Sequence, residues 1–144
     1  RPPTIDSLGL GSAITSFVDQ WRERTGIAVN LQLDEKLIRL PEATELSIFR
    51  IIQESLRNIK KHSQANNVEI ILKHTTPRTI LISILDDGVG LPDDFDLSTL
   101  ASADHYGLLG ISERVALLGG HLNMQNKQNG GMIMQVEIPH PRSK

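Results

Sequence analysis

Two strand-like apolar segments separated by only four residues constrain the fold more than any other feature of this sequence. Residues 68–74 and 79–85 are rich in Ile, Leu and Val, and the segment Thr-Thr-Pro-Arg at 75–78 lies between them. Such a short polar connection between two strands is typical of an antiparallel hairpin. The chain therefore departs from a strict alternation of strands and helices.

Hydrophobic periodicity predicts the remaining elements on both sides of this hairpin. The first is a helix of about four turns, which carries Ile14, Phe17, Val18 and Trp21 and ends at Gly26. The others, in chain order, are a strand at 27–33, a helix at 41–62, a helix at 108–118, and strands at 122–126 and 132–138. This order indicates the α+β class. We expect a two-layer α/β sandwich, in which three helices cover one face of a mixed, mostly antiparallel sheet.

Composition limits the core and the classes of function. The 144 residues suit one domain, and with 39% hydrophobic but only 3% aromatic residues its core must consist of Leu, Ile and Val. Few aromatic residues and a net charge of −2 disfavour nucleic-acid binding. The absence of cysteine excludes disulfides and thiolate zinc sites and fits a cytoplasmic location. No apolar run approaches the roughly 20 residues that span a bilayer, so we expect no membrane contact.

Three polar segments are candidates for a site. On the helix at 41–62, Glu54, Asn58 and Lys61 have the spacing i, i+4 and i+7, which places them on one face, where we expect them to converge. A solvated helix face has the same pattern. The spacing alone therefore leaves both interpretations open.

The second segment is Asp86, Asp87, Gly88, Val89 and Gly90, directly after an apolar strand. Two glycines spaced by one residue let a ligand approach the backbone, and an acidic residue before them can accept a hydrogen bond from an amine. An ordinary Asp-Gly turn is the alternative. The segment is neither a dinucleotide-binding fingerprint nor a P-loop.

The third segment contains Gly107 and Gly110, where the helix at 108–118 should begin. A helix start offers free N–H groups and the positive end of a dipole to a phosphate, although a flexible start without a ligand has the same sequence pattern. Between the second and third segments, residues 91–106 form a long connection, which we interpret as a lid.

Together and in this order, the three segments resemble the GHKL ATPase superfamily, and within it the catalytic ATP-binding domain of sensor histidine kinases paired with NarL-type response regulators. The resemblance covers nearly the whole chain. Gln53, Glu54, Leu56, Asn58, Lys61 and His62 are similar to the N box; Asp86, Gly88 and Gly90 to the DxGxG box; and Gly107, Leu108, Gly110, Glu113, Arg114, Gly119 and Gly120 to the segment that follows the lid.

The resemblance implies the Bergerat fold and a role for each matching residue. It implies that Asp86 binds the adenine amine, that Asn58 holds Mg²⁺ against the phosphates of ATP, and that Lys61 contacts phosphate with His62 beside it. The remaining ATP-binding residues that it implies are Gly88, Gly90, Gly107, Leu108 and Gly110. The resemblance leaves two roles open for Glu54: orienting water bound to the metal, or activating water for hydrolysis.

The resemblance also implies partners. Residues 1–10 resemble the end of a segment that links to a dimerisation and phosphoacceptor domain, and residues 11–144 the catalytic domain. The chain starts at Arg1, so we expect a fragment of a longer homodimeric protein, whose NarL-type response regulator takes the phosphoryl group from a histidine on the preceding domain. The parent protein is expected in the cytoplasm or anchored in the inner membrane.

Two alternatives remain. One is an autonomous ATPase in which Glu54 is the general base. The other is a non-catalytic docking module, suggested by Met132, which stands where the family usually has a threonine that supports the adenine-binding aspartate.

Overall fold

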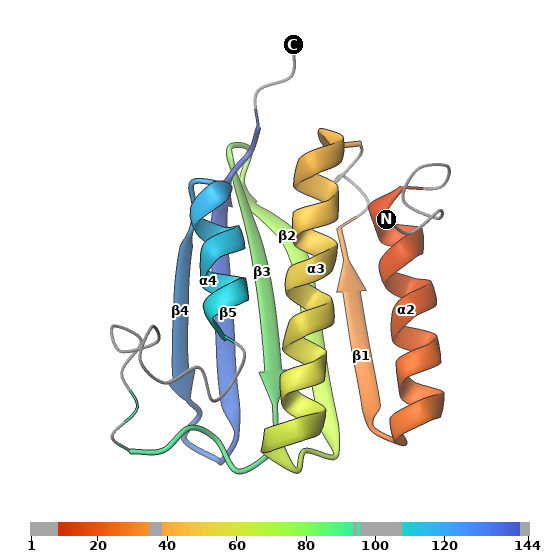
Figure 1. Cartoon of the computed structure of the whole chain (residues 1–144), viewed down its shortest axis with the longest axis vertical. Coiled ribbons are helices and arrows are strands. Elements are labelled where there is room, and N and C mark those ends of the chain that lie inside the picture. Colours follow the sequence, from red (N-terminus) through yellow and green to blue (C-terminus); the bar gives the residue numbers. More distant parts are fainter. Residues whose placement is uncertain (1–8, 35–38, 94, 96–107, 142–144) are drawn as a thin grey trace.

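The computed structural model describes residues 9–34, 39–93, 95 and 108–141, and these form a two-layer domain (Figure 1). One layer is a sheet of five strands in the order β1-β2-β3-β5-β4. The strands are β1 Ala28–Leu33, β2 Asn67–Thr76, β3 Thr79–Asp86, β4 His121–Asn126 and β5 Met132–Pro139. Only the β1–β2 pair is parallel, and β2 and β3 form the expected antiparallel hairpin. The mixed, mostly antiparallel sheet is confirmed.

The second layer consists of helices α2 Leu10–Thr25, α3 Glu42–Asn58 and α4 Leu108–Leu117. All three lie on the same side of the sheet, with α3 between α2 and α4 (Figure 1). The predicted end of the first helix is confirmed: Gly26 has a positive φ of 74°, and its N–H donates to the carbonyl of Arg22 at 2.8 Å. None of the helices in the described part of the chain is long and apolar enough to cross a membrane.

The core between the two layers is aliphatic, as the composition predicts. Its largest fully buried side chains are Ile14, Ile48, Ile51, Ile52, Leu56, Ile70, Ile80, Ile82, Ile84, Leu108 and Ile111. The stripe predicted on α3 faces this core, since Phe49, Ile52 and Leu56 are all buried. Burial of these side chains on both layers fixes the helices against one sheet face.

The long central helix differs from the sequence prediction at its end. The α-helical part stops at Asn58, and the chain continues as a π-helical turn, η1 Ile59–Ser63. The loop after β3 packs against this turn, because the Val89 N–H donates to the carbonyl of Ser63 at 2.7 Å. Tertiary packing therefore sets the last turn, whereas periodicity predicted only a regular helix.

Most of the predicted lid, Gly107 and residues 1–8 lie outside the described residues. The division of the chain at residue 10 stays a prediction.

Candidate functional site

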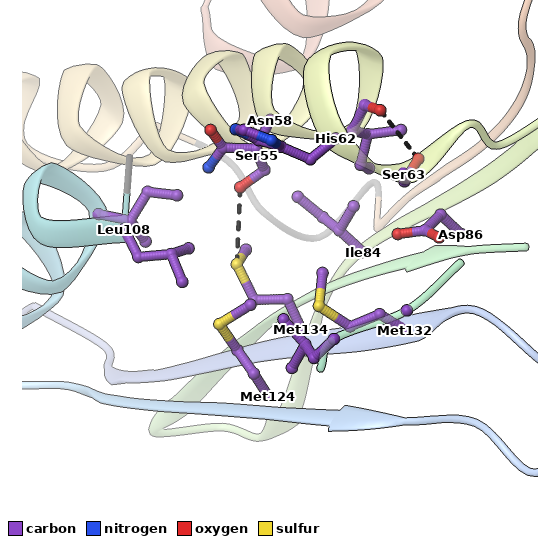
Figure 2. A pocket seen from close by; sticks show the side chains of 14 residues that line it. Ser55, Asn58, His62, Ser63, Ile84, Asp86, Leu108, Met124, Met132 and Met134 are labelled. Atoms are coloured by element: carbon purple, nitrogen blue, oxygen red, sulfur yellow. Dashed lines mark hydrogen bonds between the residues drawn. The ribbon is translucent and has the colours of Figure 1, made fainter. Parts of the chain in front are cut away.

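A hollow lies between the end of α3, the start of α4 and the helix-facing side of the sheet (Figure 2). It encloses about 510 Å³ free of protein atoms, counting the part open to solvent. Its lining comes from Ser55, Asn58, Ile59, His62 and Ser63 on the helical side, Ile84, Asp86, Met124, Met132 and Met134 on the strands, and Gly90, Leu91, Leu108 and Ile111.

Asp86, at the end of β3, is the buried carboxylate of this hollow. The residue is 2% exposed, and its Oδ1 accepts a hydrogen bond from the Gly88 N–H at 2.8 Å. Its Oδ2 is buried and has no hydrogen-bond partner among the described residues. Burial raises the pKa of Asp86 above its ordinary value, and the Gly88 N–H partly opposes that rise. One acceptor thus remains available to a ligand with a hydrogen-bond donor.

Asn58 brings a donor to the same hollow from the helical side. Its Nδ2 is buried and likewise has no partner within the described part of the chain. The two serines that line the hollow are engaged in their own helix, since Ser55 Oγ donates to Ile51 O at 2.6 Å and Ser63 Oγ to Ile59 O at 2.8 Å. Because unpaired buried polar atoms are costly, Asp86 Oδ2 and Asn58 Nδ2 mark where a polar ligand would bind.

The glycines after Asp86 shape the loop that closes this side of the hollow. A Cβ at Gly88 would collide with the carbonyl of Ser63, so the absence of a side chain lets the loop reach η1. Gly90 has a φ of 77° and lines the hollow, whereas Gly88 does not. Asn126 then holds the next residue from both sides, because its Oδ1 accepts from the Leu91 N–H at 2.7 Å and its Nδ2 donates to Leu91 O at 3.0 Å.

The Asp87 carboxylate holds two strands together, a role that the sequence did not predict. Its carboxylate accepts hydrogen bonds from Asn67 Nδ2 at 2.8 Å, the Asn66 N–H at 2.8 Å and the Asn67 N–H at 2.9 Å. These bonds, that of the Asn67 side chain first, lower the pKa of Asp87 to about 2. The clamp ties the end of β3 to the start of β2 and so fixes the strand end that carries Asp86. No sequence pattern reveals it, because it depends on the register of two strands.

Glu54 and Lys61 lie elsewhere than expected from their spacing. Both line a second hollow between α2 and α3, together with Phe17 and Trp21, and Glu54 lies 3.9 Å from Arg57. Neither lines the hollow that contains Asn58. A π turn has more residues per turn than an α-helix, so η1 rotates Lys61 away from Asn58. The expected convergence of the three side chains on one place is therefore wrong for the structure as it stands.

Of the site residues predicted in the third segment, one described residue lines the hollow. Leu108, at the start of α4, is buried there, whereas Gly110 is exposed, with open space where a Cβ would be. Gly107 lies outside the described residues. His62 lines the hollow beside Asn58 (Figure 2).

The donor set fits a magnesium ion only in part. No group of three or more His, Cys, Asp or Glu side chains that could hold a metal occurs among the residues the structure describes. Mg²⁺, however, is commonly bound by one or two protein ligands together with substrate phosphates. The Asn58 amide, whose nitrogen is buried and unpaired among the described residues, can supply one such ligand through its oxygen.

Comparisons with known proteins identify the family of the chain. Residues 43–142 match the family described as "Histidine kinase-, DNA gyrase B-, and HSP90-like ATPase". The chain is 36% identical over 140 residues to the signal transduction histidine-protein kinase/phosphatase DegS of Brevibacillus brevis, covering 96% of this chain and 34% of DegS. It is 32% identical over 139 residues to the oxygen sensor histidine kinase NreB of Staphylococcus carnosus (strain TM300), covering 96% of this chain and 39% of NreB. It thus spans between a third and two fifths of these curated relatives.

Solved structures share the fold. The histidine kinase domain of the blue-light activated histidine kinase of Erythrobacter litoralis EL346 superposes with a TM-score of 0.77 at 24% identity, over 91% of this chain and 61% of that one. Full-length ShkA in complex with AMPPNP superposes with a TM-score of 0.71 at 17% identity, over 94% of this chain and 30% of that one. At these identities the likeness supports the α+β fold alone.

Proposed function

Because the chain belongs to the family of histidine kinase-, DNA gyrase B- and HSP90-like ATPases, we propose that ATP binds in the hollow between α3, α4 and the sheet. One observation carries this proposal: an unpaired acceptor, Asp86 Oδ2, and an unpaired donor, Asn58 Nδ2, line a single hollow. Adenine carries an exocyclic amine that suits the acceptor, and the apolar walls suit a flat base. The phosphates would then extend toward Asn58.

The phosphate end of the ligand requires residues beyond the base pocket. Asn58 would ligate Mg²⁺, which when bound offsets the charge of the phosphate oxygens. His62 lies beside Asn58 in the hollow. Lys61 lines the second hollow in this structure, so its long side chain would have to turn around η1 to contact a phosphate oxygen. Gly88, Gly90, Gly107, Leu108 and Gly110 remain proposed contacts of the nucleotide or of its surrounding loops.

We propose that the reaction is phosphoryl transfer to a histidine on a dimerisation and phosphoacceptor domain of the same homodimeric protein. The imidazole nitrogen forms a bond to the γ-phosphorus while the bond to the β,γ-bridging oxygen breaks, and ADP leaves. A NarL-type response regulator in the cytoplasm would next take the phosphoryl group. The similarity to DegS and NreB, both named histidine kinases, supports this proposal.

The autonomous ATPase is the weaker alternative. A general base must reach the attacking water beside the γ-phosphate, but Glu54 lines the second hollow and lies near Arg57. A Glu54→Gln variant that abolished a robust release of phosphate would revive the ATPase.

The decisive experiment combines binding and transfer. Calorimetric titration of the chain with Mg²⁺ and a non-hydrolysable ATP analogue tests the hollow, and γ-labelled ATP with the phosphoacceptor domain tests the transfer. Asn58→Ala should abolish labelling of the histidine. Asn123→Ala is a matched control, because Asn123 is exposed on β4 and does not line the hollow. Equal labelling by wild type and Asn58→Ala would refute the proposal, and no heat of binding would favour the docking module.

A further inference from the structure

All three methionines of the chain line the same hollow. Met132 and Met134 alternate along β5, Met124 on β4 lies directly across from Met134, and Met132 lies across from Asp86 on β3. Figure 2 shows the three thioethers together on the sheet side, below the helix that carries Asn58. The sulfur atoms therefore gather beside the one buried carboxylate of the site.

The three sulfurs differ in access. Met134 is 2% exposed, and its Sδ lies 3.6 Å from Ser55 Oγ, whose shorter hydrogen bond goes to Ile51 O at 2.6 Å. Met124 and Met132 are only partly buried. An oxidant that enters the hollow should therefore reach Met124 and Met132 before Met134.

We propose that Met124 and Met132 are oxidation sites, and that their conversion to methionine sulfoxide by a peroxide blocks nucleotide binding. The inference rests on the proposed nucleotide site. Hydrogen peroxide transfers one oxygen atom to Sδ: an S–O bond forms, the O–O bond breaks, sulfur loses two electrons, and the peroxide is reduced to water. Since the chain contains no cysteine, thiols cannot compete for the oxidant.

The chemistry of the product explains the block. A thioether is apolar and fits against a flat base, whereas a sulfoxide carries a polar oxygen that only accepts hydrogen bonds. Met132 lies across from Asp86, so its sulfoxide oxygen would place a second acceptor beside Asp86 Oδ2, where the amine of the base needs an acceptor that is free of competition. A base that covered this oxygen would strip its water without replacing the hydrogen bond. Reductases specific for the two sulfoxide epimers would reverse the change.

The test treats the full chain with hydrogen peroxide, with and without Mg²⁺ and the non-hydrolysable ATP analogue. Peptide mass spectrometry should find sulfoxide at Met124 and Met132 before Met134, with slower oxidation when the analogue is bound. Calorimetry should find the affinity for the analogue lowered on the order of tenfold. Treatment with both epimer-specific reductases and a thiol should restore it.

Two variants make the result specific, each compared with its own untreated sample. In a Met124→Leu, Met132→Leu double variant, peroxide should no longer weaken binding. Leu117→Met adds a thioether at a residue that is 84% exposed and outside the hollow. Peroxide should therefore lower the affinity of this variant as much as that of wild type, and no further.

Three outcomes would overturn the inference. They are sulfoxide at Met124 and Met132 with unchanged affinity, equal loss in the double variant, or no oxidation of either residue under conditions that oxidise the added thioether of the Leu117→Met control. If the untreated chain binds no analogue, the proposed function fails instead, and the mass spectra still test the order of oxidation.

Discussion

Replacing Asp86 by Asn separates the role of its carboxylate in nucleotide binding from any role in stability. Asn keeps an oxygen that can accept the hydrogen bond from the Gly88 N–H, now 2.8 Å from Asp86 Oδ1. It places an amide NH₂ where the unpaired Oδ2 lies. A ligand amine would then face a donor, so the variant loses the hydrogen bond to the base while its shape hardly changes.

The magnitude of this loss follows from the charge of the acceptor. Hydrogen bonds to charged groups contribute about 1.5–3 kcal/mol, which corresponds to a rise in the dissociation constant of roughly 10- to 150-fold. Whereas the affinity for the nucleotide falls, the unfolding free energy of the nucleotide-free variant should rise. Because burial raises the pKa of Asp86 above its ordinary value of 3.8, its stabilising contribution is fully present below pH 3.8 and is lost as pH rises through the folded-state pKa.

Above that folded-state pKa the buried, ionised carboxylate lowers stability, and Asp86→Asn removes that cost. Calorimetry with the ATP analogue should find weaker binding, while thermal unfolding without nucleotide should give a melting temperature equal to or above that of wild type. Wild-type affinity in the variant would refute the assignment of Oδ2 to the base. A loss of affinity together with a lower melting temperature would mean that Asp86 acts by holding the fold.

Three further predictions concern the scaffold of the site. Asp87→Asn should be less stable to urea than wild type at pH 6, and the difference should shrink between pH 4 and 2. The reason is that the stability which Asp87 contributes above its ordinary pKa of 3.8 is lost as pH falls through its folded pKa of about 2. A difference in stability that stayed constant with pH would contradict this. Gly130→Ala should lower the unfolding free energy by about 1–2 kcal/mol, because Gly130 has a φ of 96°. Gly131→Ala should lower it further and also weaken binding of the ATP analogue, because its Cβ would collide with the carbonyl of Asp86. Equal losses of stability in the two variants would refute the steric argument. Ile82→Ala, at a fully buried position of β3 outside the hollow, should lower the unfolding free energy by about 2–5 kcal/mol with unchanged m-value, and a cost below about 1 kcal/mol would show that the core collapses around it.

Local chemistry made much of the fold predictable. The hairpin of β2 and β3, the apolar stripe of α3 and the helix stop at Gly26 each depend on neighbours within a few residues, and the structure confirms all three. The sequence also predicted that Asp86 and Asn58 belong to one site, and both line one hollow.

Register and helix geometry were not predictable in the same way. The clamp of Asp87 on Asn67, the hold of Asn126 on Leu91 and the place of Met132 across from Asp86 all depend on how strands far apart in sequence pair. Periodicity identifies a strand but not its partner.

The sequence by itself therefore determined which segments form strands and helices and which polar residues could form a site. Hydrophobic periodicity and residue type control local structure through residues that are close together in the chain. Only the tertiary structure decided how those residues divide between two hollows. The loop after β3 packs on Ser63, the last residue of the π turn, and Asn58 lines one hollow while Lys61 lines the other. Rotation about a helix axis depends on the packing of its last turn, which no local pattern encodes.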